Sequence, residues 1–308
     1  MMCKILSKSF FVTLFLLNST GLMAMPKTNG VDKSMIELES EIRNESQTRP
    51  MLSGSRLNLK NINGRIEIEG WDKNEIQVDA VITDNPEYRI KIETTQDNQG
   101  ITINVQFPKQ FYGSAFFGLF QWNLRPWKKD SLKCDLKLRV PRKLQGSFTN
   151  VNGFTGVNNI EGSIAIDSVN GDFEVRSIKG VFKGDTTNGT ISVTEADAGL
   201  ELKTVNGSIK LDQVSGSIKA GTVNGSILAK NLNGKDGGMS FKTVNGGVRL
   251  ALGSASGTLH LTNLVGKITY TDNTGRLYRG NRLFSTDIPG SQQKIKVATV
   301  NGSIEVVQ

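Results

Sequence analysis

Side chains that could act together in catalysis are scarce in this sequence. One histidine, His260, occurs among the 308 residues. It alternates with apolar neighbours in Gly257–Leu261, as an outward-facing strand residue would. A Ser-His-Asp arrangement would have to use this histidine, and no serine lies in a nucleophile-elbow motif. No Cys/His cluster has the spacing of a zinc site. The sequence therefore predicts no catalytic residue, no metal ligand and no cofactor.

A pair of aspartates eighteen residues apart provides the enzymatic alternative. Asp167, Asp185 and Lys203 occupy the same position in successive units of a repeat. Stacking of these units would place the two carboxyl groups about 5 Å apart, near the separation found in retaining glycosidases. No aromatic residue neighbours this column to hold a sugar, and two acids beside a lysine usually form a surface charge cluster. A carbohydrate-active β-helix enzyme acting on an envelope or extracellular glycan stays the second hypothesis.

The repeat that positions these residues runs from Val151 to Asn233. A small residue, usually glycine, recurs every nine residues, and every second one is preceded by asparagine. Apolar and polar residues alternate after each glycine, which is typical of a half-buried strand. A fixed period of this length indicates a repeat architecture. The asparagines are Asn152, Asn170, Asn188, Asn206 and Asn224.

The nine-residue unit predicts one strand and one corner, and eighteen residues predict one coil. The chain is therefore expected to be all-β, a single-stranded β-solenoid (β-helix) with parallel ladders between coils. Each Asn-Gly tolerates positive φ and is expected to turn the chain sharply. A hairpin could also use Asn-Gly, but the spacing is constant and apolar residues flank both sides of the turn, as at corners wrapped around a core. The asparagine column is expected to stack amide on amide, which is a structural role.

The ends of the chain differ from the repeat. Residues 1–24 have a basic start, a short apolar run and a small residue at the end, the pattern of a secretory signal peptide. The apolar run is too short to span a bilayer core of about 30 Å, and no later segment is long and apolar enough. Residues 25–50 form a polar N-terminal arm in this interpretation, with a short helix considered around Ser34–Asn44. The solenoid is assigned to 51–308.

Within the solenoid, residues 51–140 are expected to form an irregular N-terminal cap and 141–308 the repeat body. An aromatic insert, 109–131, interrupts the cap. It could be an exposed loop that contacts a membrane surface, a glycan or a protein, or a flap over the open end of the solenoid. The candidate partner-binding residues are Phe111, Tyr112, Phe116, Phe117, Trp122 and Trp127.

The remaining charged and thiol groups indicate no further chemistry. The formal net charge is +8, and it falls to +6 without the two lysines of the predicted signal peptide. Lys203, Lys210, Lys219 and Lys230 occupy different repeat positions and partly different faces, and aromatic residues are not interleaved with them, so no nucleic-acid partner is expected. Cys134 shares the apolar face of a predicted strand and is expected to be a buried, inert thiol.

Several motifs resemble those of one known family. Asn63-Gly64-Arg65-Ile66-Glu67-Ile68-Glu69-Gly70-Trp71-Asp72, Leu136–Pro141, the Val-Asn-Gly-Ser-Ile units and Thr299–Val306 are similar to the bacterial putative-adhesin family of uncharacterised β-strand-repeat envelope proteins. This resemblance implies a β-solenoid in the bacterial envelope with no established catalytic residues. We therefore expect an exported, non-enzymatic monomer in the periplasm or at the cell surface. Its solenoid would present a surface to an envelope, glycan or protein partner.

Overall fold

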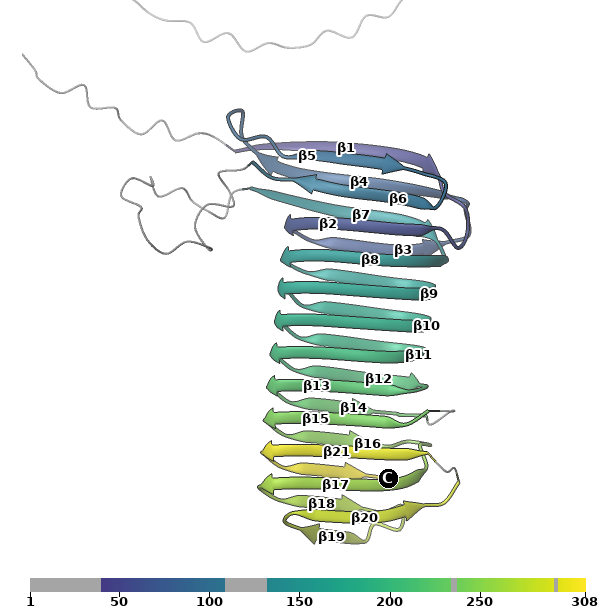
Figure 1. Ribbon diagram of the computed structural model, residues 1–308, viewed down its shortest axis with the longest axis vertical. Helices are drawn as coiled ribbons and strands as arrows, with labels where there is room; N and C mark the ends of the chain where they lie inside the picture. The colour runs from purple at the N-terminus through teal and green to yellow at the C-terminus, as the bar shows by residue number, and fades with distance from the viewer. Residues whose placement is uncertain (1–39, 109–131, 234–236, 291–292) are drawn as a thin grey trace, which may run out of the picture. The chain divides into compact units, whose positions relative to one another are not determined.

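Strands are the regular elements of this chain. The computed structural model describes residues 40–108, 132–233, 237–290 and 293–308, and within these ranges 22 strands hydrogen-bond into one largely parallel, solenoid-like sheet (Figure 1). The all-β prediction is confirmed. No helix in these ranges is long and apolar enough to cross a membrane. The predicted signal peptide and the aromatic insert lie outside the described residues.

Nine strands of the described residues form the regular middle part of the repeat body. Their bounds are β8 (Lys143–Asn152), β9 (Thr155–Asn170), β10 (Phe173–Asn188), β11 (Ile191–Asn206), β12 (Ile209–Ser215), β13 (Ile218–Asn224), β14 (Ile227–Lys230), β15 (Met239–Asn245) and β16 (Val248–Ala251). β9, β10 and β11 pair in parallel, and the paired residues are eighteen positions apart, as in Phe173 and Ile191. The sequence period and the register of the sheet therefore agree in this region.

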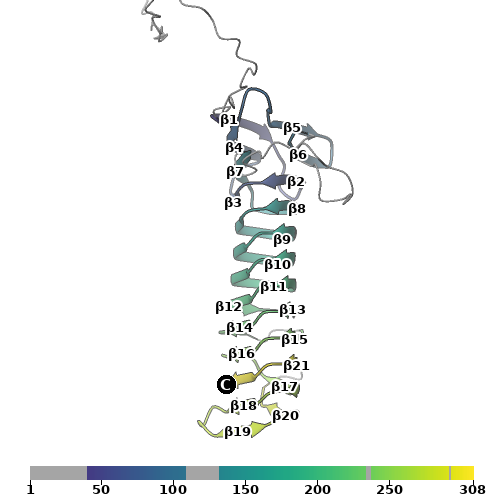
Figure 2. The same cartoon turned by 90° about the vertical axis from the view of Figure 1, so that its left-hand side faces the viewer.

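Each long strand contributes to two faces. The first half of β11 pairs with β12 and its second half pairs with β13, so two ladders run side by side through the stack. Figure 2 shows them as two columns of strands. We call face A the column with β12, β14 and β16, and face B the column with β8, β13, β15 and the second halves of β9, β10 and β11. One level of this stack is a rung.

Alternation along the strands fills the space between the two faces. Ile209 and Leu211 are buried, whereas Lys210 between them is exposed. The apolar column two residues after each small residue is buried along the whole repeat, as the sequence predicts. Each such aliphatic side chain stabilises the stack by roughly 1.5–3 kcal/mol. The columns from neighbouring rungs form one continuous core.

The apolar column before the small residue behaves differently at the two corners. Ile178 and Val214, on one corner, are buried, but Val205 and Val223, before Asn-Gly on the other, are exposed. The expectation that both corners wrap apolar residues around the core is therefore wrong for the Asn-Gly corner. Side chains alternate in direction along the strand at this corner. The residue two positions before asparagine faces the core, so the residue directly before asparagine faces the solvent.

Positive φ is also found mainly at the other corner. The non-glycine residues with φ between 52° and 60° are Asn159, Ser177, Glu195, Gln213 and Asn231, all eighteen apart. The glycines of four successive Asn-Gly corners, such as Gly207, do not have left-handed φ. Glycine is needed there because a Cβ on Gly207 would collide with the carbonyl oxygen of Gly189 on the preceding rung. Close approach of two backbones, rather than a left-handed turn, explains this column.

The N-terminal end begins with seven strands. These are β1 (Glu41–Pro50), β2 (Arg56–Asn63), β3 (Ile66–Trp71), β4 (Glu75–Asp84), β5 (Lys91–Gln96), β6 (Gly100–Gln106) and β7 (Lys133–Pro141). β2 and β3 extend faces B and A by pairing in parallel with β8 and β9. β1, β4 and β7 form an antiparallel layer beyond them, and β5 pairs antiparallel with β6. We call β1 and β4–β7 the N-terminal cap.

The N-terminal arm is shorter than predicted. Glu41–Pro50, which belongs to the segment expected to be a polar arm, is strand β1 and pairs along its full length with β4. The helix considered up to Asn44 is therefore wrong for residues 41–44, and the rest of that segment lies outside the described residues. β1 is polar because it is an edge strand with one neighbour, so it buries little apolar surface.

The C-terminal end has a stacking order that differs from its chain order. Its strands are β17 (Gly257–Val265), β18 (Ile268–Thr271), β19 (Leu277–Gly280), β20 (Leu283–Ile288), β21 (Lys294–Asn301) and β22 (Ile304–Val307). β21 lies between β15 and β17, and β22 lies between β16 and β18 (Figure 1, yellow). The last strands are in the repeat register, as expected, but they form the penultimate rung of the parallel stack. β20 pairs antiparallel with β17, and β19 pairs antiparallel with β18, so these two strands form the outer edges at this end.

Candidate functional site

A groove runs along face B beside the Asn-Gly corner. It has a volume of about 870 Å³ and crosses β10, β11, β13, β15, β21 and β17, which are six consecutive rungs. Its outer wall is the column of residues directly before the asparagine position, each between 37% and 61% exposed. These residues are Val205, Val223, Val244, Val300 and Leu264. The same register that builds the core therefore also builds an exposed aliphatic ridge.

The inner wall lies two residues earlier on each strand. It contains Asp185, Lys203, Gly221, Lys242, Ala298 and Thr262. Three of these six residues are uncharged, so the wall is low at Gly221 and Ala298 and rises at the two lysines. The groove is consequently aliphatic along one side and carries two lysines and one aspartate along the other.

The floor is a buried column of threonines whose hydroxyl groups are already bonded. Thr204 Oγ1 donates to the carbonyl of Gly189 at 3.1 Å, and Thr222 Oγ1 donates to that of Gly207 at 2.9 Å. Thr243 and Thr299 repeat this contact on the next two rungs. Because the protons of these hydroxyls are used within the stack, the floor offers no free hydroxyl donor to a ligand.

The asparagine column borders the groove on the corner side. Each amide Nδ2 donates to the Oδ1 of the asparagine one rung before it, at distances of 2.7–3.0 Å. The linked residues are the five predicted ones, Asn152, Asn170, Asn188, Asn206 and Asn224, followed by Asn245 and Asn301. Sequence reasoning missed the last two because they lie 21 and 56 residues further on, although both occur in a Val-Asn-Gly motif. The ladder stops at β17, where Val265 pairs with Asn301.

Lysines gather on face B next to the groove. Lys219 and Lys296 flank Ser240 on the neighbouring strands, and Lys242 lies two residues beyond Ser240 on the same side of β15. No carboxylate lies on the outward side of β13, β15 or β21 in the part of the chain that the structure describes. The lysines named from the sequence do divide between faces, since Lys210 and Lys230 lie on face A. The ones on face B nevertheless form a basic patch.

The aspartates of the enzymatic alternative are paired across β9 and β10. Asp167 and Asp185 occupy opposing register positions, and Lys203 is opposite Asp185 on the next rung. Asp185 forms an ion pair with Lys183 at 3.3 Å, and Lys203 forms one with Glu201 at 2.6 Å. The hydrogen bond from Lys203 lowers the pKa of Glu201 below its ordinary value. These contacts are typical of exposed charge pairs.

The histidine and the cysteine have structural surroundings. His260 is half-exposed on β17, and its Nδ1 lies 3.0 Å from the hydroxyl oxygen of Ser285 on β20. Cys134 is fully buried in β7, and burial raises the pKa of its thiol to about 12. A thiol with that pKa is protonated at neutral pH and is a poor nucleophile. The prediction of a buried cysteine is confirmed.

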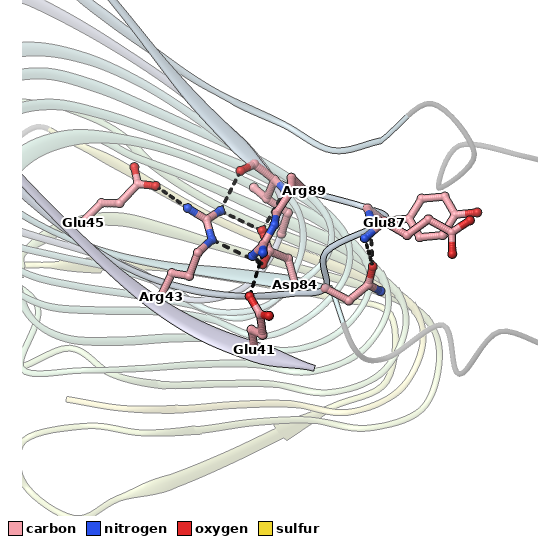
Figure 3. Close-up of polar contacts among 9 residues, drawn as sticks. Glu41, Arg43, Glu45, Asp84, Glu87 and Arg89 are labelled. Carbon is pink, nitrogen blue, oxygen red and sulfur yellow. Dashed lines mark hydrogen bonds and ion pairs between the residues drawn. The ribbon is translucent and has the colours of Figure 1, made fainter. Parts of the chain in front are cut away.

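A buried carboxylate, Asp84, organises the N-terminal cap (Figure 3). Its oxygens accept hydrogen bonds from Arg43 Nη2 at 2.7 Å, Arg89 Nη1 at 2.9 Å and the backbone N–H of Ile90 at 3.0 Å. Glu41 and Glu45 pair with the outer sides of the two arginines. Burial alone would raise the pKa of Asp84, but these hydrogen bonds lower it below the ordinary value. Every oxygen of Asp84 is thus engaged in holding the turn after β4 against β1.

The predicted aromatic binding loop is a different region. Phe111, Tyr112, Phe116, Phe117, Trp122 and Trp127 all lie outside the described residues. The groove on face B was not predicted as a site. The sequence feature that could have indicated the groove is the repeated Thr-Val-Asn-Gly motif. The alternation of buried and exposed residues places the valine of this motif on the solvent side of the strand.

Solved structures similar to this chain are bacterial proteins described as a putative cell adhesion protein, putative adhesins and a putative lipid binding protein. A putative cell adhesion protein from Clostridium sporogenes is 13% identical, with a TM-score of 0.33, over 86% of this chain and 100% of that one. A putative adhesin from Bacteroides fragilis is 11% identical, with a TM-score of 0.37, over 86% and 97%. A putative lipid binding protein from Parabacteroides distasonis is 14% identical, with a TM-score of 0.33, over 86% and 97%.

No family model and no curated protein matches the chain. Two of the three descriptions, putative cell adhesion protein and putative adhesin, agree with the family that the sequence motifs resemble. Because their TM-scores are below 0.5, these matches do not indicate what this chain binds.

Proposed function

We propose that this chain is an exported, non-enzymatic protein of the bacterial envelope, built as a single-stranded β-solenoid of eighteen-residue coils. Its function in this proposal is to bind a partner along the groove of face B. The eighteen-residue register of β9–β11 supports the coil, and the signal-peptide pattern of residues 1–24 supports export.

One observation carries the binding role. Val205, Val223, Val244 and Val300 repeat an exposed aliphatic side chain at a position that contributes little to the core. Contiguous exposed apolar surface on a soluble protein usually marks an interaction site. Stacked repeats are well suited to this role because they hold equivalent side chains at fixed spacing along an extended surface.

The non-enzymatic part of the proposal is supported by the state of the candidate catalytic groups. Asp185 and Lys203 are engaged in ion pairs with residues on their own strands. His260 contacts Ser285 at the C-terminal end of the stack, and the described residues include no ion pair between the histidine ring and a carboxylate. A retaining glycosidase would need a raised pKa on one of two carboxyl groups facing a sugar-binding cleft.

The test combines location with contact. A photo-crosslinking amino acid is placed at Val223 on the groove wall or, as the matched control, at Lys210 on face A, which is also exposed. Protease accessibility on intact cells and cell fractionation then locate the protein. We expect an exported protein that forms crosslinks from position 223 and not from position 210. A cytoplasmic location, or equal crosslinking from both positions, would contradict the proposal.

A further inference from the structure

Resting on the proposed function, we infer that the groove of face B binds one acyl chain of an anionic lipid. The chain starts at the rung of Val244 and lies along the groove past Val223 and Val205 to β10. The acidic head group lies against the basic patch formed by Lys219, Lys242 and Lys296 around Ser240.

The length of the groove suits one acyl chain. The basic patch lies beside β15, and the groove extends from β15 over three further rungs to β10. At about 4.8 Å per rung, this part of the groove is about 14 Å long. One leaflet of a bilayer contributes about half of a hydrocarbon core of about 30 Å, which sets the length of an acyl chain at about 15 Å. The groove between β15 and β10 therefore matches the length of one acyl chain.

The polarity of the groove favours hydrocarbon over a peptide. β13, β15 and β21 are each hydrogen-bonded to a strand on both sides, so their backbone groups are already paired. A peptide strand lying in the groove would leave its own N–H and C=O groups unsatisfied. An acyl chain has no such groups and buries only apolar surface.

A glycan fits less well for a related reason. Sugar recognition uses aromatic faces and free hydrogen-bond donors. The lining of the groove holds no aromatic ring. The hydroxyl groups of the floor residues Thr204, Thr222 and Thr243 already donate to glycine carbonyls. The lysines supply charge, which suits an anion rather than a neutral sugar.

The basic patch lies beside the middle rungs of the groove and provides a place for the charged end of an amphiphile. Lys219, Lys242 and Lys296 surround Ser240 on three adjacent strands. The structure records no ion pair for these lysines with a described carboxylate, although Glu201, which pairs with Lys203, is opposite Lys219 on the next strand. A carboxylate or phosphate placed over Ser240 would therefore gain charge-assisted hydrogen bonds from lysine ammonium groups.

The test is a fluorescence titration of the full mature chain with a fluorescent long-chain fatty acid kept below its micelle concentration. The groove variant is Val223→Asn with Val244→Asn, and Val169→Asn is the matched control, because Val169 has the same exposed position on β9 outside the groove. We expect the groove variant to raise the Kd at least about tenfold and the control to leave it unchanged. These side chains are exposed, and thermal melting checks that all variants fold.

A second pair of variants tests the head group. Lys242→Glu with Lys296→Glu should weaken binding of the fatty acid about tenfold and leave the corresponding fatty alcohol unaffected, whereas Lys210→Glu on face A should affect neither. Binding of a short-chain carboxylate as tight as that of the long chain would overturn the inference, since it would show anion binding only. So would binding to anionic vesicles without binding of the monomeric fatty acid.

The two proposals fail separately. Crosslinks from Val223 to a protein, together with no fatty-acid binding by the purified chain, would overturn the lipid assignment and leave the interaction surface intact. No fatty-acid binding and no crosslinks from Val223 would overturn both.

Discussion

In the N-terminal cap one side chain, Asp84, collects hydrogen bonds from Arg43, Arg89 and the backbone of Ile90. In the repeat body, the polar side chains that the fold places close together form columns, in which equivalent hydrogen bonds recur from rung to rung. Seven asparagines are joined by six side-chain hydrogen bonds, and five threonines each donate to a glycine carbonyl. The cap therefore depends on one charged network, whereas the body depends on many equivalent neutral contacts.

This difference predicts how far the effect of a substitution on stability should extend through the structure. In a stacked repeat each unit contacts only its neighbours, so the stability is close to a sum of local terms. Removing one member of a column costs that member's contacts. Removing Asp84 instead leaves two arginines without their shared partner, and the turn after β4 loses its anchor.

The largest expected effect is therefore in the cap. Asp84→Ala should destabilise the cap by up to about 3–5 kcal/mol, because breaking a buried ion pair from one side leaves the two arginines with only their exposed partners, Glu45 and Glu41. Native-state hydrogen exchange should show loss of protection in β1 and β4 and little change in β10 and β11. Uniform loss of protection through the whole stack would contradict the separation of cap and body.

Acid should reproduce part of that effect without mutation. The pKa of Asp84 is lowered in the folded state, while in the unfolded state it is about 3.9. Its contribution to stability is therefore fully present above about pH 4 and is lost as the pH falls through the folded pKa. Exchange measured from pH 6 down to pH 3 should show the cap opening before the body, whose amide ladder does not titrate. Asp84→Asn is the control in which this pH dependence of the cap disappears.

The sequence predicts the body better than the ends for a physical reason. The alternation around Ile209 and the spacing of the asparagines are local, so both can be read along the chain. The rung order at the C-terminus is not local. The Val-Asn-Gly-Ser-Ile unit at Asn301 fits beside any rung, and it lies next to Asn245 from a strand 56 residues earlier. Identical columns specify the register of a rung but not its place in the stack.

The candidate site and the cap network escaped prediction for two further reasons. Valine is apolar whether its corner faces the core or the solvent, so composition alone could not separate Val205 from Val214. Arg43 and Asp84 are 41 residues apart and belong to no repeat, so no spacing links them before β1 pairs with β4.

Next in size is the glycine column of the Asn-Gly corner. Gly207→Ala should destabilise the body by about 3 kcal/mol, because the added methyl group would meet the backbone carbonyl of Gly189 and force the rungs apart. Gly221→Ala is the matched control, since its Cβ would have only an ordinary contact with the carbonyl of Lys242. That variant should be neutral or more stable by about 0.5–1 kcal/mol. Denaturant unfolding measures both, and equal losses would mean that close approach does not explain the column.

The asparagine ladder should show a smaller effect that depends on position. Asn206 donates to Asn188 and accepts from Asn224, whereas Asn301 at the end donates to Asn245. Asn206→Ala should cost about 1–2 kcal/mol and Asn301→Ala about half of that, because a hydrogen bond contributes about 1 kcal/mol net. Equal costs at the two positions would show that the amides act through something other than their mutual hydrogen bonds.

The smallest expected effect is a gain at the opposite corner. Gln213 has a φ of 55° and an exposed side chain, and the equivalent positions one and three units away are occupied by Asn231 and Asn159. Asparagine tolerates the left-handed region better than glutamine, so Gln213→Asn should stabilise the body by about 0.5 kcal/mol, which raises the Tm by about 1–2 °C. Lys210→Asn, in an extended strand, is the control and should not stabilise the fold. A loss at position 213 would mean that the left-handed backbone is not the source of strain there. A gain would establish that the two corners of one eighteen-residue repeat obey different rules, with backbone contact selecting glycine at one and local conformation selecting asparagine at the other.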